Sequence, residues 1–345
     1  MTTLATFNLA DRETRDRIIG EIVARTGVPA KQGRRFAELT SLRVGGVIDW
    51  VLSPVTEEQA ARVVGELNEA AVMWRVLGAG SNVLADDAEH HYIVMNMRDL
   101  KGVAEFDGER VSVSAGYSLP RLCIEAARAG LAGIEGLGGI PGTVGGALWM
   151  NAGAYGNEIG NVVETVRVAQ GGRVVTLPGD VVEWNYRHTS FKPGDLLLGA
   201  TLRLKRDARE EIESRMETAK RQRLATQPHG ARSAGCFFKN FPGGSTGRML
   251  DELGLKGSRR GGALVSSVHA NFIVTDGQSA SATDTLALAE EIRERVRRER
   301  GIELEYEVEL WKAQHTRAQE KSDYEGDKQA MLNGDNAAET IKKAK

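Results

Sequence analysis

The sequence predicts an α+β protein with more than one domain. Helix and strand periodicities alternate near both ends of the chain, whereas the middle is rich in strand patterns and glycine. The 345 residues exceed the ~100–200 residues of an ordinary domain, so two or three domains are expected. We divide the chain into regions 1–100, 101–206 and 207–311, followed by a polar tail at 312–345 whose composition predicts disorder.

The first region combines amphipathic helices with short buried strands. Residues 11–26 carry isoleucine and valine on one face of a predicted helix. A second helix begins at Thr56, and Gln59 three residues later completes a capping box. The apolar runs at 74–78 and 91–96 predict strands.

The middle region begins with a strand and a well-delimited helix. A strand is predicted at 110–116, followed by a helix at 119–129 with Ser118 as its N-cap and Gly130 at its end. The stretch 131–160 is too rich in glycine for a simple element. Three strand-like segments separated by turns follow, so the rest of this region is expected to be mostly β-structure.

The last region reads as a solvated linking helix followed by a smaller αβ unit. The charged segment 205–223 predicts the linking helix. Residues 284–301 predict a strong amphipathic helix that stops at Gly301, and 302–311 a final strand.

Composition limits the classes of function. The net charge of −2 provides no basic field for nucleic acid or membrane. The two cysteines, Cys123 and Cys236, are too few for a metal cluster, so no metal is expected, and free thiols suit a reducing cytosol. The polar N-terminus lacks a signal-peptide core, and no apolar run reaches the ~18–20 residues of a membrane span. We therefore expect a cytoplasmic protein.

Two clusters of the 40 glycines are candidate backbone cradles for a ligand. The first follows a predicted strand and contains Gly78, Ala79, Gly80, Ser81 and Asn82. On its own it fits either an anion-binding turn, with Ser81 and Asn82 as extra donors, or a tight structural turn. The second includes Gly139, Ile140, Pro141, Gly142, Thr143, Gly145 and Gly146. Such a loop loses much entropy on folding, and a bound ligand would compensate for that loss.

Four further segments carry reactive or polar side chains. They are 151–156, 186–192, 233–240 and 261–274, and a short acidic motif follows at 305–308. Taken singly, their residues have ordinary explanations. Arg187 suits a surface ion pair, Cys236 a buried apolar position, Glu307 a solvated strand and His269 a hydrogen-bonded structural histidine.

In this order and spacing, the segments resemble the UDP-N-acetylenolpyruvoylglucosamine reductase (MurB) family. GAGSN, IPGTVGGALWMNAGAYG, YRHTSF, SAGCFFKN and HANFIV carry the resemblance, which covers roughly 270 residues from Thr40 to Val308. It implies an FAD-binding domain of the vanillyl-alcohol-oxidase (PCMH) type in two subdomains, plus a C-terminal α+β substrate domain. It also implies NADPH as electron donor and UDP-N-acetylglucosamine enolpyruvate as the substrate, reduced to UDP-N-acetylmuramate. A monomer is favoured.

The resemblance also implies roles for individual residues. It makes Arg187 and Glu307 catalytic and Cys236 the donor of a proton to the substrate. The FAD pyrophosphate would lie on 78–82 and 139–146, with Arg43 near the flavin. Contacts with the substrate would come from Tyr155, Arg223, Asn240 and His269. These residue types suit the chemistry, because an arginine fork matches a carboxylate and a protonated thiol can deliver a proton.

The sequence departs from the family pattern at a few positions. Tyr306 and Glu309 stand where the family usually has proline and a basic residue. The short link between Phe191 and Leu197 resembles the branch that lacks an additional tyrosine loop. Two rival functions stay open at this point: another FAD-dependent oxidase or dehydrogenase of the same fold, and a non-catalytic flavin-binding paralogue.

Overall fold

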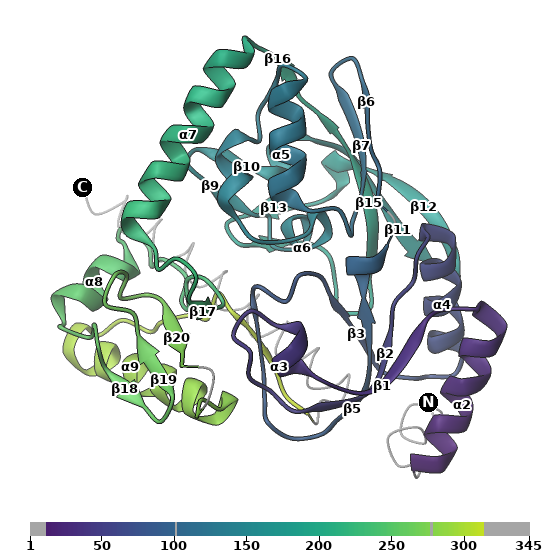
Figure 1. Ribbon diagram of the computed structural model, residues 1–345, viewed down its shortest axis with the longest axis horizontal. Helices are drawn as coiled ribbons and strands as arrows, with labels where there is room; N and C mark the ends of the chain where they lie inside the picture. Colours follow the sequence, from purple (N-terminus) through teal and green to yellow (C-terminus); the bar gives the residue numbers. More distant parts are fainter. Residues whose placement is uncertain (1–11, 101, 277–278, 314–345) are drawn as a thin grey trace, which may run out of the picture.

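The computed structural model describes residues 12–100, 102–276 and 279–313. Their strands form three main sheets, against which the helices pack (Figure 1). None of the described helices is both long enough and apolar enough to cross a membrane. The predicted disordered tail, apart from its first two residues, lies outside the described residues.

The N-terminal sheet is mostly parallel and is buried on both faces. Its order is β1 (Ala30–Arg35), β2 (Val47–Leu52), β5 (His90–Asn96) and β3 (Trp74–Leu77), with only the β1–β2 pair antiparallel. Alternate residues of β5 enter different clusters: Ile93 and Met95 join the core under α2 (Arg12–Thr26) and α4 (Glu57–Glu69), whereas Tyr92 and Val94 face the opposite side. Short elements α3 (Phe36–Leu39) and η1 (Met97–Asp99) flank the sheet.

The middle of the chain forms an antiparallel sheet with two helices against it. Its order is β12 (Arg173–Pro178), β11 (Val163–Gln170), β15 (Leu196–Arg203), β7 (Arg110–Ser114) and β6 (Ala104–Asp107). The helices are α5 (Leu119–Arg128) and the short α6 (Val144–Trp149). In β15, Leu196 and Leu198 pack in the core of α2 and α4, while Leu197 and Leu202 pack in that of α5, so one strand joins the two cores.

Several short elements complete this middle region. They are β8 (Leu131–Ala132), η2 (Glu135–Gly139), β9 (Gly153–Ala154), β10 (Asn157–Glu158), η3 (Ile159–Val162), η4 (Gly179–Val181), β13 (Trp184–Asn185), β14 (His188–Thr189) and β16 (Lys205–Arg206). The polar helix α7 (Arg209–Thr226) then crosses to the C-terminal elements (Figure 1).

The C-terminal elements have their own sheet and core. The sheet order is β17 (Arg232–Ser233), β20 (Ile273–Thr275), β19 (Ala263–Val265) and β18 (Arg259–Arg260), with α8 (Thr246–Glu252) and α9 (Ala282–Arg300). The last strand, β21 (Glu309–Trp311), leaves this unit and pairs in parallel with β4 (Val83–Ala85). The chain therefore returns to its N-terminal half directly after Glu307.

The predicted helix ends agree well with the structure, because short-range capping fixes them. The Thr56 side chain accepts from Gln59 N, Ser118 caps α5, and Gly301 ends α9 in a left-handed conformation with φ 66°. The division at residues 100 and 206 stays a prediction.

Three local predictions were wrong. The glycine-rich stretch 131–160 contains a real helix, α6, because Thr143 caps its first turn. The linking helix starts at Arg209 and not at 205, since β16 pairs with β8. Of the predicted strand 302–311 only β21 forms, because the residues before it have no continuous partner strand and make one isolated bridge, Phe238 to Tyr306.

Candidate active site

Two tight hairpins in the middle region position polar side chains at their turns. Tyr186 and Arg187 form the two-residue turn between β13 and β14, and Tyr155 and Gly156 form the turn between β9 and β10. Arg187 and Tyr155 have positive φ values of 53° and 49°, a conformation that is costly for residues with a side chain. Such strain concentrates at functional sites.

A partly buried ion pair joins the first hairpin to the C-terminal segment. Arg187 Nε lies 2.8 Å from Glu307 Oε1, and Arg187 Nη2 donates to Gly153 O at 3.0 Å. The side chains are only 20% and 16% exposed, so water screens the pair weakly. Glu307 is itself held by its backbone, because Glu307 N donates to Phe237 O and Asn82 Nδ2 donates to Glu307 O.

Burial governs the electrostatics of this pair. Burial raises the pKa of Glu307 above its ordinary value, although Arg187 and then Lys239 act in the opposite direction. For Arg187, burial alone would lower the pKa, but the charge and hydrogen bond of Glu307, together with Tyr186 and Cys236, outweigh it, and the pKa is raised. The guanidinium therefore stays charged, and the carboxyl binds a proton more readily than an exposed glutamate would.

Cys236 lies beside this pair and is kept protonated. The pKa of its thiol is raised to about 12, chiefly by burial and then by the charge of Glu307, while Arg187, Arg223 and a hydrogen bond with Asn271 oppose the shift. At neutral pH the sulfur thus carries a proton that it can donate. The preceding Gly235 has φ 82°, which lets the chain turn sharply before the thiol.

Arg223, at the end of α7, approaches the same group from another side. Burial lowers the pKa of Arg223, while Tyr155 and Cys236 oppose that shift through their charges. The side chain lies against the second glycine loop, since a Cβ placed on Gly139 would come within 2.7 Å of Arg223 Cδ. A third segment of the chain therefore adds a cation near Cys236.

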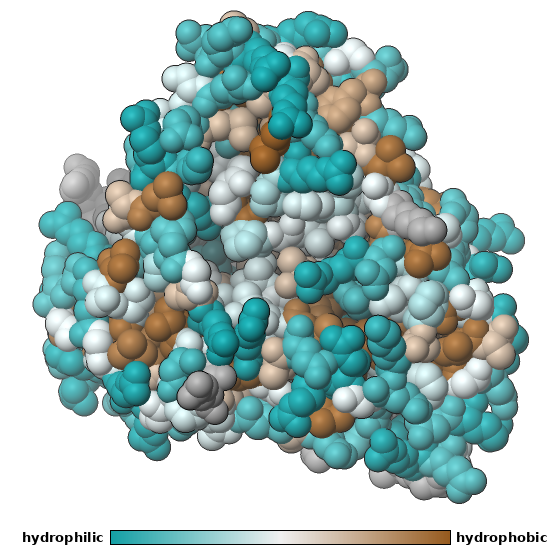
Figure 2. Space-filling view, viewed as in Figure 1, coloured by the Kyte–Doolittle hydropathy of each residue, from teal (hydrophilic) through white to brown (hydrophobic). Residues whose placement is uncertain are grey.

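The two glycine loops contact each other and reach the ion pair. Ser81 Oγ donates to Pro141 O, and a Cβ on Gly78 would lie 2.6 Å from Thr143 Oγ1. Asn82 then connects the first loop to Glu307 by the hydrogen bond given above. Figure 2 shows a pale surface of intermediate hydropathy at the centre of the visible face, between more hydrophilic lobes.

Comparison with known proteins identifies the family of this chain. Residues 48–184 match the model of an FAD binding domain, and residues 227–311 match that of the UDP-N-acetylenolpyruvoylglucosamine reductase C-terminal domain. A UDP-N-acetylenolpyruvoylglucosamine reductase from Geobacter sulfurreducens is 36% identical over 296 residues, which cover 86% of this chain and 98% of that protein. The chain belongs to the UDP-N-acetylenolpyruvoylglucosamine reductase family.

Further relatives agree with this assignment. The reductase of the same name from Trichlorobacter lovleyi is 39% identical over 275 residues, covering 80% of this chain and 90% of that protein. The crystal structure of UDP-N-acetylenolpyruvylglucosamine reductase (MurB) from Thermus caldophilus matches with a TM-score of 0.69 and 37% identity, over 82% of this chain and 98% of that one. The predicted family and α+β fold, with an FAD-binding part and a C-terminal domain, are confirmed.

The glycine loops fit the FAD that this family membership implies. Gly78, Gly80, Gly139 and Gly145 are explained by close approach of protein atoms. At Gly142 and Gly146, in contrast, a Cβ would meet only side-chain oxygens at 3.9 and 3.6 Å, which is ordinary contact. A cradle thus stays open at these two positions, where a ligand can approach the backbone closely.

Some hydrogen-bond donors of the glycine loops have partners inside the protein. The amides of Gly145 and Gly146 donate to Ala115 O and to Thr143 Oγ1, and the Ser81 hydroxyl donates to Pro141. These donors are therefore used inside the protein in this structure, and the role of Ser81 toward FAD stays a prediction. Contacts between the phosphates and residues 78–82 and 139–146 stay predictions.

Arg43 and Asn240, two further predicted site residues, make contacts of their own with neighbouring segments. Arg43 is exposed, with φ 55°, in a segment that Ser41 ties to Gly80 O. The side chain of Asn240 accepts from Thr246 N, while its backbone N donates to the hydroxyl of Tyr186. The short link 192–195 forms a single turn. The roles given to Arg43 and Asn240, and the family branch, stay predictions.

His269 has a packing role in the structure. Its Nδ1 accepts from Asn271 N at 3.1 Å, its ring contacts Phe272, and a Cβ on Gly247 would lie 2.6 Å from its Cε1. Burial lowers its pKa, so the ring is neutral near pH 7. Its predicted contact with the substrate stays a prediction.

Two residues at the site were missed by the sequence analysis. Asn271 is buried and brackets Phe238, accepting from Phe238 N at 3.0 Å and donating to Phe238 O at 2.8 Å, besides its bond with Cys236. The ring of Tyr186 lies under the Arg187 guanidinium, and its centroid is 5.0 Å from the guanidinium carbon. Both belong to motifs that were recognised, but only the fold shows which side chain faces the site.

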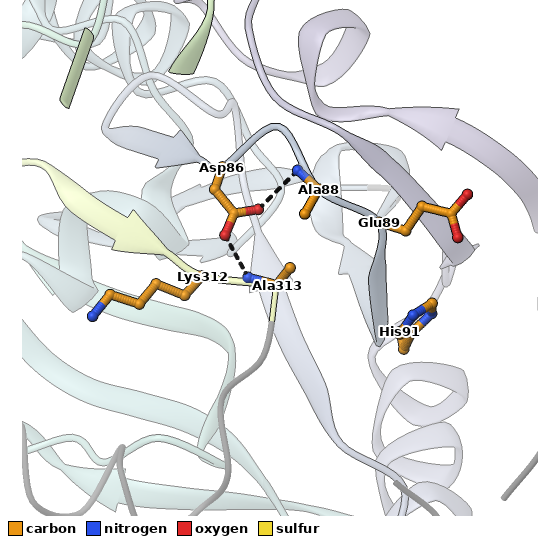
Figure 3. Close-up of a pocket in the computed structure, with 6 residues that line it drawn as sticks. All are labelled: Asp86, Ala88, Glu89, His91, Lys312 and Ala313. Atoms are coloured by element: carbon orange, nitrogen blue, oxygen red, sulfur yellow. Dashed lines mark hydrogen bonds between the residues drawn. The ribbon is translucent and has the colours of Figure 1, made fainter. Parts of the chain in front are cut away.

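A separate hollow lies at the other end of the β4–β21 pair. Its volume is about 470 Å³, and Asp86, Ala88, Glu89, His91, Lys312 and Ala313 line it. Figure 3 shows Asp86 accepting from the amides of Ala88 and Ala313. Asn82 and Glu307 precede β4 and β21, whereas this hollow follows them, so it lies away from the ion pair. In the described part of the chain, no group of three acidic, histidine or cysteine side chains could hold a metal ion.

Proposed function

We propose that this chain is an FAD-dependent reductase that uses NADPH to convert UDP-N-acetylglucosamine enolpyruvate into UDP-N-acetylmuramate. The observation that carries the proposal is the Arg187–Glu307 pair beside the protonated thiol of Cys236. The family membership and the match to an FAD binding domain support the cofactor and the reaction. When bound, FAD supplies a hydride to the β-carbon of the enolpyruvyl double bond.

We assign Arg187 to the carboxylate of the substrate. As the double bond accepts a hydride, negative charge grows on that carboxylate, and a fixed guanidinium is its natural counter-charge. The guanidinium is well positioned for this role, since Glu307 and Gly153 O hold two of its nitrogens. Because charge is greatest in the transition state, the interaction favours that state over bound substrate.

Cys236 is assigned the final proton transfer. Its Sγ–H bond breaks as a C–H bond forms at the α-carbon of the substrate, so the hydride and this proton together saturate the double bond. The thiolate that remains is reprotonated from water, and its high pKa favours this recovery. Glu307, whose pKa is raised, orients Arg187 and shares a proton with this site.

The substrate would contact further residues around Cys236. Arg223 lies near both Tyr155 and Cys236, and it suits the UDP phosphates because it is a cation beside the second glycine loop. We also propose that the enzyme is a monomer. The free thiols of Cys123 and Cys236 support the reducing cytoplasm as its location.

An assay of NADPH consumption tests the proposal. Purified protein reconstituted with FAD should oxidise NADPH rapidly only when UDP-N-acetylglucosamine enolpyruvate is present, with one product molecule formed per NADPH. Protein that binds no FAD, or that consumes NADPH at the same rate without this substrate, would contradict it. An intact Arg187–Glu307 pair argues against a non-catalytic paralogue, which this assay would also reveal.

A further inference from the structure

Tyr306, the residue before Glu307, fixes this part of the chain against the segment of Cys236. Tyr306 makes the isolated bridge with Phe238, flanked by hydrogen bonds from Lys239 N to Glu305 O and from Glu307 N to Phe237 O. Phe237 and Phe238 directly follow Cys236. The bridge therefore sets the register between the segment that carries the proton donor and the segment that carries the carboxyl.

A stack of side chains fixes that register. The ring of Tyr306 is stacked on Phe238, with centroids 5.4 Å apart and planes at 30°, and meets Phe237 edge-on at 6.1 Å. The other partner of the ring is Arg293 of α9, whose guanidinium carbon lies 5.0 Å from the centroid. Such aromatic and cation–π contacts depend on ring position, so they resist sliding of one segment along the other.

Helix α9 completes the attachment. The hydroxyl of Tyr306 donates to Glu290 Oε1 at 2.7 Å, and Arg293 donates both to Glu290 and to Leu304 O. None of these three groups touches Arg187 or Cys236 by a contact found in the described residues. The helix thus holds the segment before Glu307 through the side chain of Tyr306 and the carbonyl of Leu304, and its apolar face packs in the same core as Phe237 and Phe238.

We infer that Tyr306, stacked between Phe238 and Arg293 and tied to Glu290, is a positioning residue that sets Glu307 against Arg187 and Cys236. The inference rests on the proposed function, since it names what holds that function's carboxyl in place. The bridge hydrogen bonds use the amides of Lys239 and Glu307 and not that of Tyr306, so a residue without an amide hydrogen at this position would lose neither of them. In this chain the side chain supplies the rigidity.

The experiment separates the two half-reactions in wild type, Tyr306→Ala and Tyr306→Phe. Reduction of the flavin by NADPH should stay within about threefold of wild type, because it needs no carboxyl at 307. Reoxidation by UDP-N-acetylglucosamine enolpyruvate should slow by about 10–100-fold in Tyr306→Ala, in its rate more than in its apparent affinity. Tyr306→Phe, which keeps the stack, should lose no more than about threefold.

A double-mutant comparison distinguishes positioning from general damage. In a Glu307→Gln background, Tyr306→Ala should cause less than about a threefold further loss, since the group that it positions is already gone. The matched control is Tyr117→Ala, because Tyr117 has the same arrangement, with its hydroxyl on Glu125 and Arg121 over its ring at 5.2 Å. That variant should change the unfolding temperature without a selective loss of reoxidation.

Several results would overturn the inference. These are equal slowing of both half-reactions in Tyr306→Ala, equal defects in the alanine and phenylalanine variants, and independent losses in the double mutant. A fall in unfolding temperature with normal reoxidation would have the same consequence. Failure of wild-type protein to be reoxidised at all would instead refute the proposed function, so the two are distinguishable.

Discussion

Burial raises the pKa of both cysteines, but the two thiols have different surroundings. Burial raises the pKa of Cys123 to about 12, and the thiol donates to Ile134 O at 3.1 Å within the apolar core around α5. Burial also raises the pKa of Cys236 to about 12, but its surroundings contain Glu307, Arg187 and Arg223. The first thiol is enclosed by packing, whereas the second lies among charges that act on it in both directions.

This difference shows that a shifted pKa alone does not indicate function. Both thiols are protonated at neutral pH, and both sequence contexts are partly apolar. Only Cys236 stands beside an arginine that can bind a carboxylate and a carboxyl that can share a proton. The charges around a protonated group, more than its own pKa, separate a proton donor from a packed side chain.

Replacing each cysteine by alanine should give the largest difference in turnover between the two regions. Cys236→Ala should lower substrate reduction by about 10²–10⁴-fold, since a positioned general acid contributes that much. Cys236→Ser, which keeps a proton, should retain most of the activity. Steady-state turnover with NADPH measures both, and Cys123→Ala is the matched control that should leave turnover unchanged. Equal turnover in Cys236→Ala and wild type would contradict the assignment.

Arginine substitutions should give the next largest effect. Arg187→Ala should slow turnover by about 10²–10³-fold, through lost stabilisation of the charged carboxylate. The matched control is Arg167→Ala, because Arg167 and Glu57 form an ion pair of similar exposure, 19% and 17%, away from the site. Arg167→Ala should lower the free energy of unfolding by about 1–3 kcal/mol and spare turnover. Similar turnover in the two variants would show that Arg187 is only structural.

The pH dependence of thiol alkylation should sharpen the comparison further. Below a pKa of about 12 the thiolate fraction of Cys236 grows about tenfold per pH unit, so its reaction with iodoacetamide should accelerate from pH 7 to 10 in that proportion. Glu307→Gln removes a charge that raises the pKa, so alkylation of Cys236 should become faster at every pH in this range. Peptide mass spectrometry follows each cysteine separately. A slower reaction in Glu307→Gln would contradict the electrostatic account.

The smallest effect should be on stability in the Cys123 region. Cys123→Ala leaves a small void in a packed core, so the free energy of unfolding should fall by about 1–3 kcal/mol with normal flavin content. Urea denaturation followed by circular dichroism measures this change. A comparable fall in substrate reduction would remove the distinction between the two regions.

Much of the fold could be predicted because its signals are local. Thr56, Ser118 and Gly301 delimit helices through contacts within a few residues. The strand predicted at 302–311 failed for the opposite reason. Its alternation does bury Leu304 and Val308, but a ladder needs a partner strand, and the residues before β21 lack a continuous one.

The site could be predicted only through the resemblance. Arg187 and Glu307 are 120 residues apart, and each alone has an ordinary explanation. Motif matching located the segments, but the hydrogen bonds of Asn271, two residues after His269, became visible only in the fold. Tyr306 was recognised as a departure from the family pattern, and its contact with α9 became visible only in three dimensions.

The most direct test of the account follows the flavin spectrum without oxygen, in wild type and in Arg187→Ala. NADPH should bleach the flavin absorption of both proteins. Added UDP-N-acetylglucosamine enolpyruvate should then restore it quickly in wild type and about 10²–10³-fold more slowly in the variant. Equally fast restoration in both proteins, or wild-type flavin that this substrate fails to reoxidise, would contradict the account.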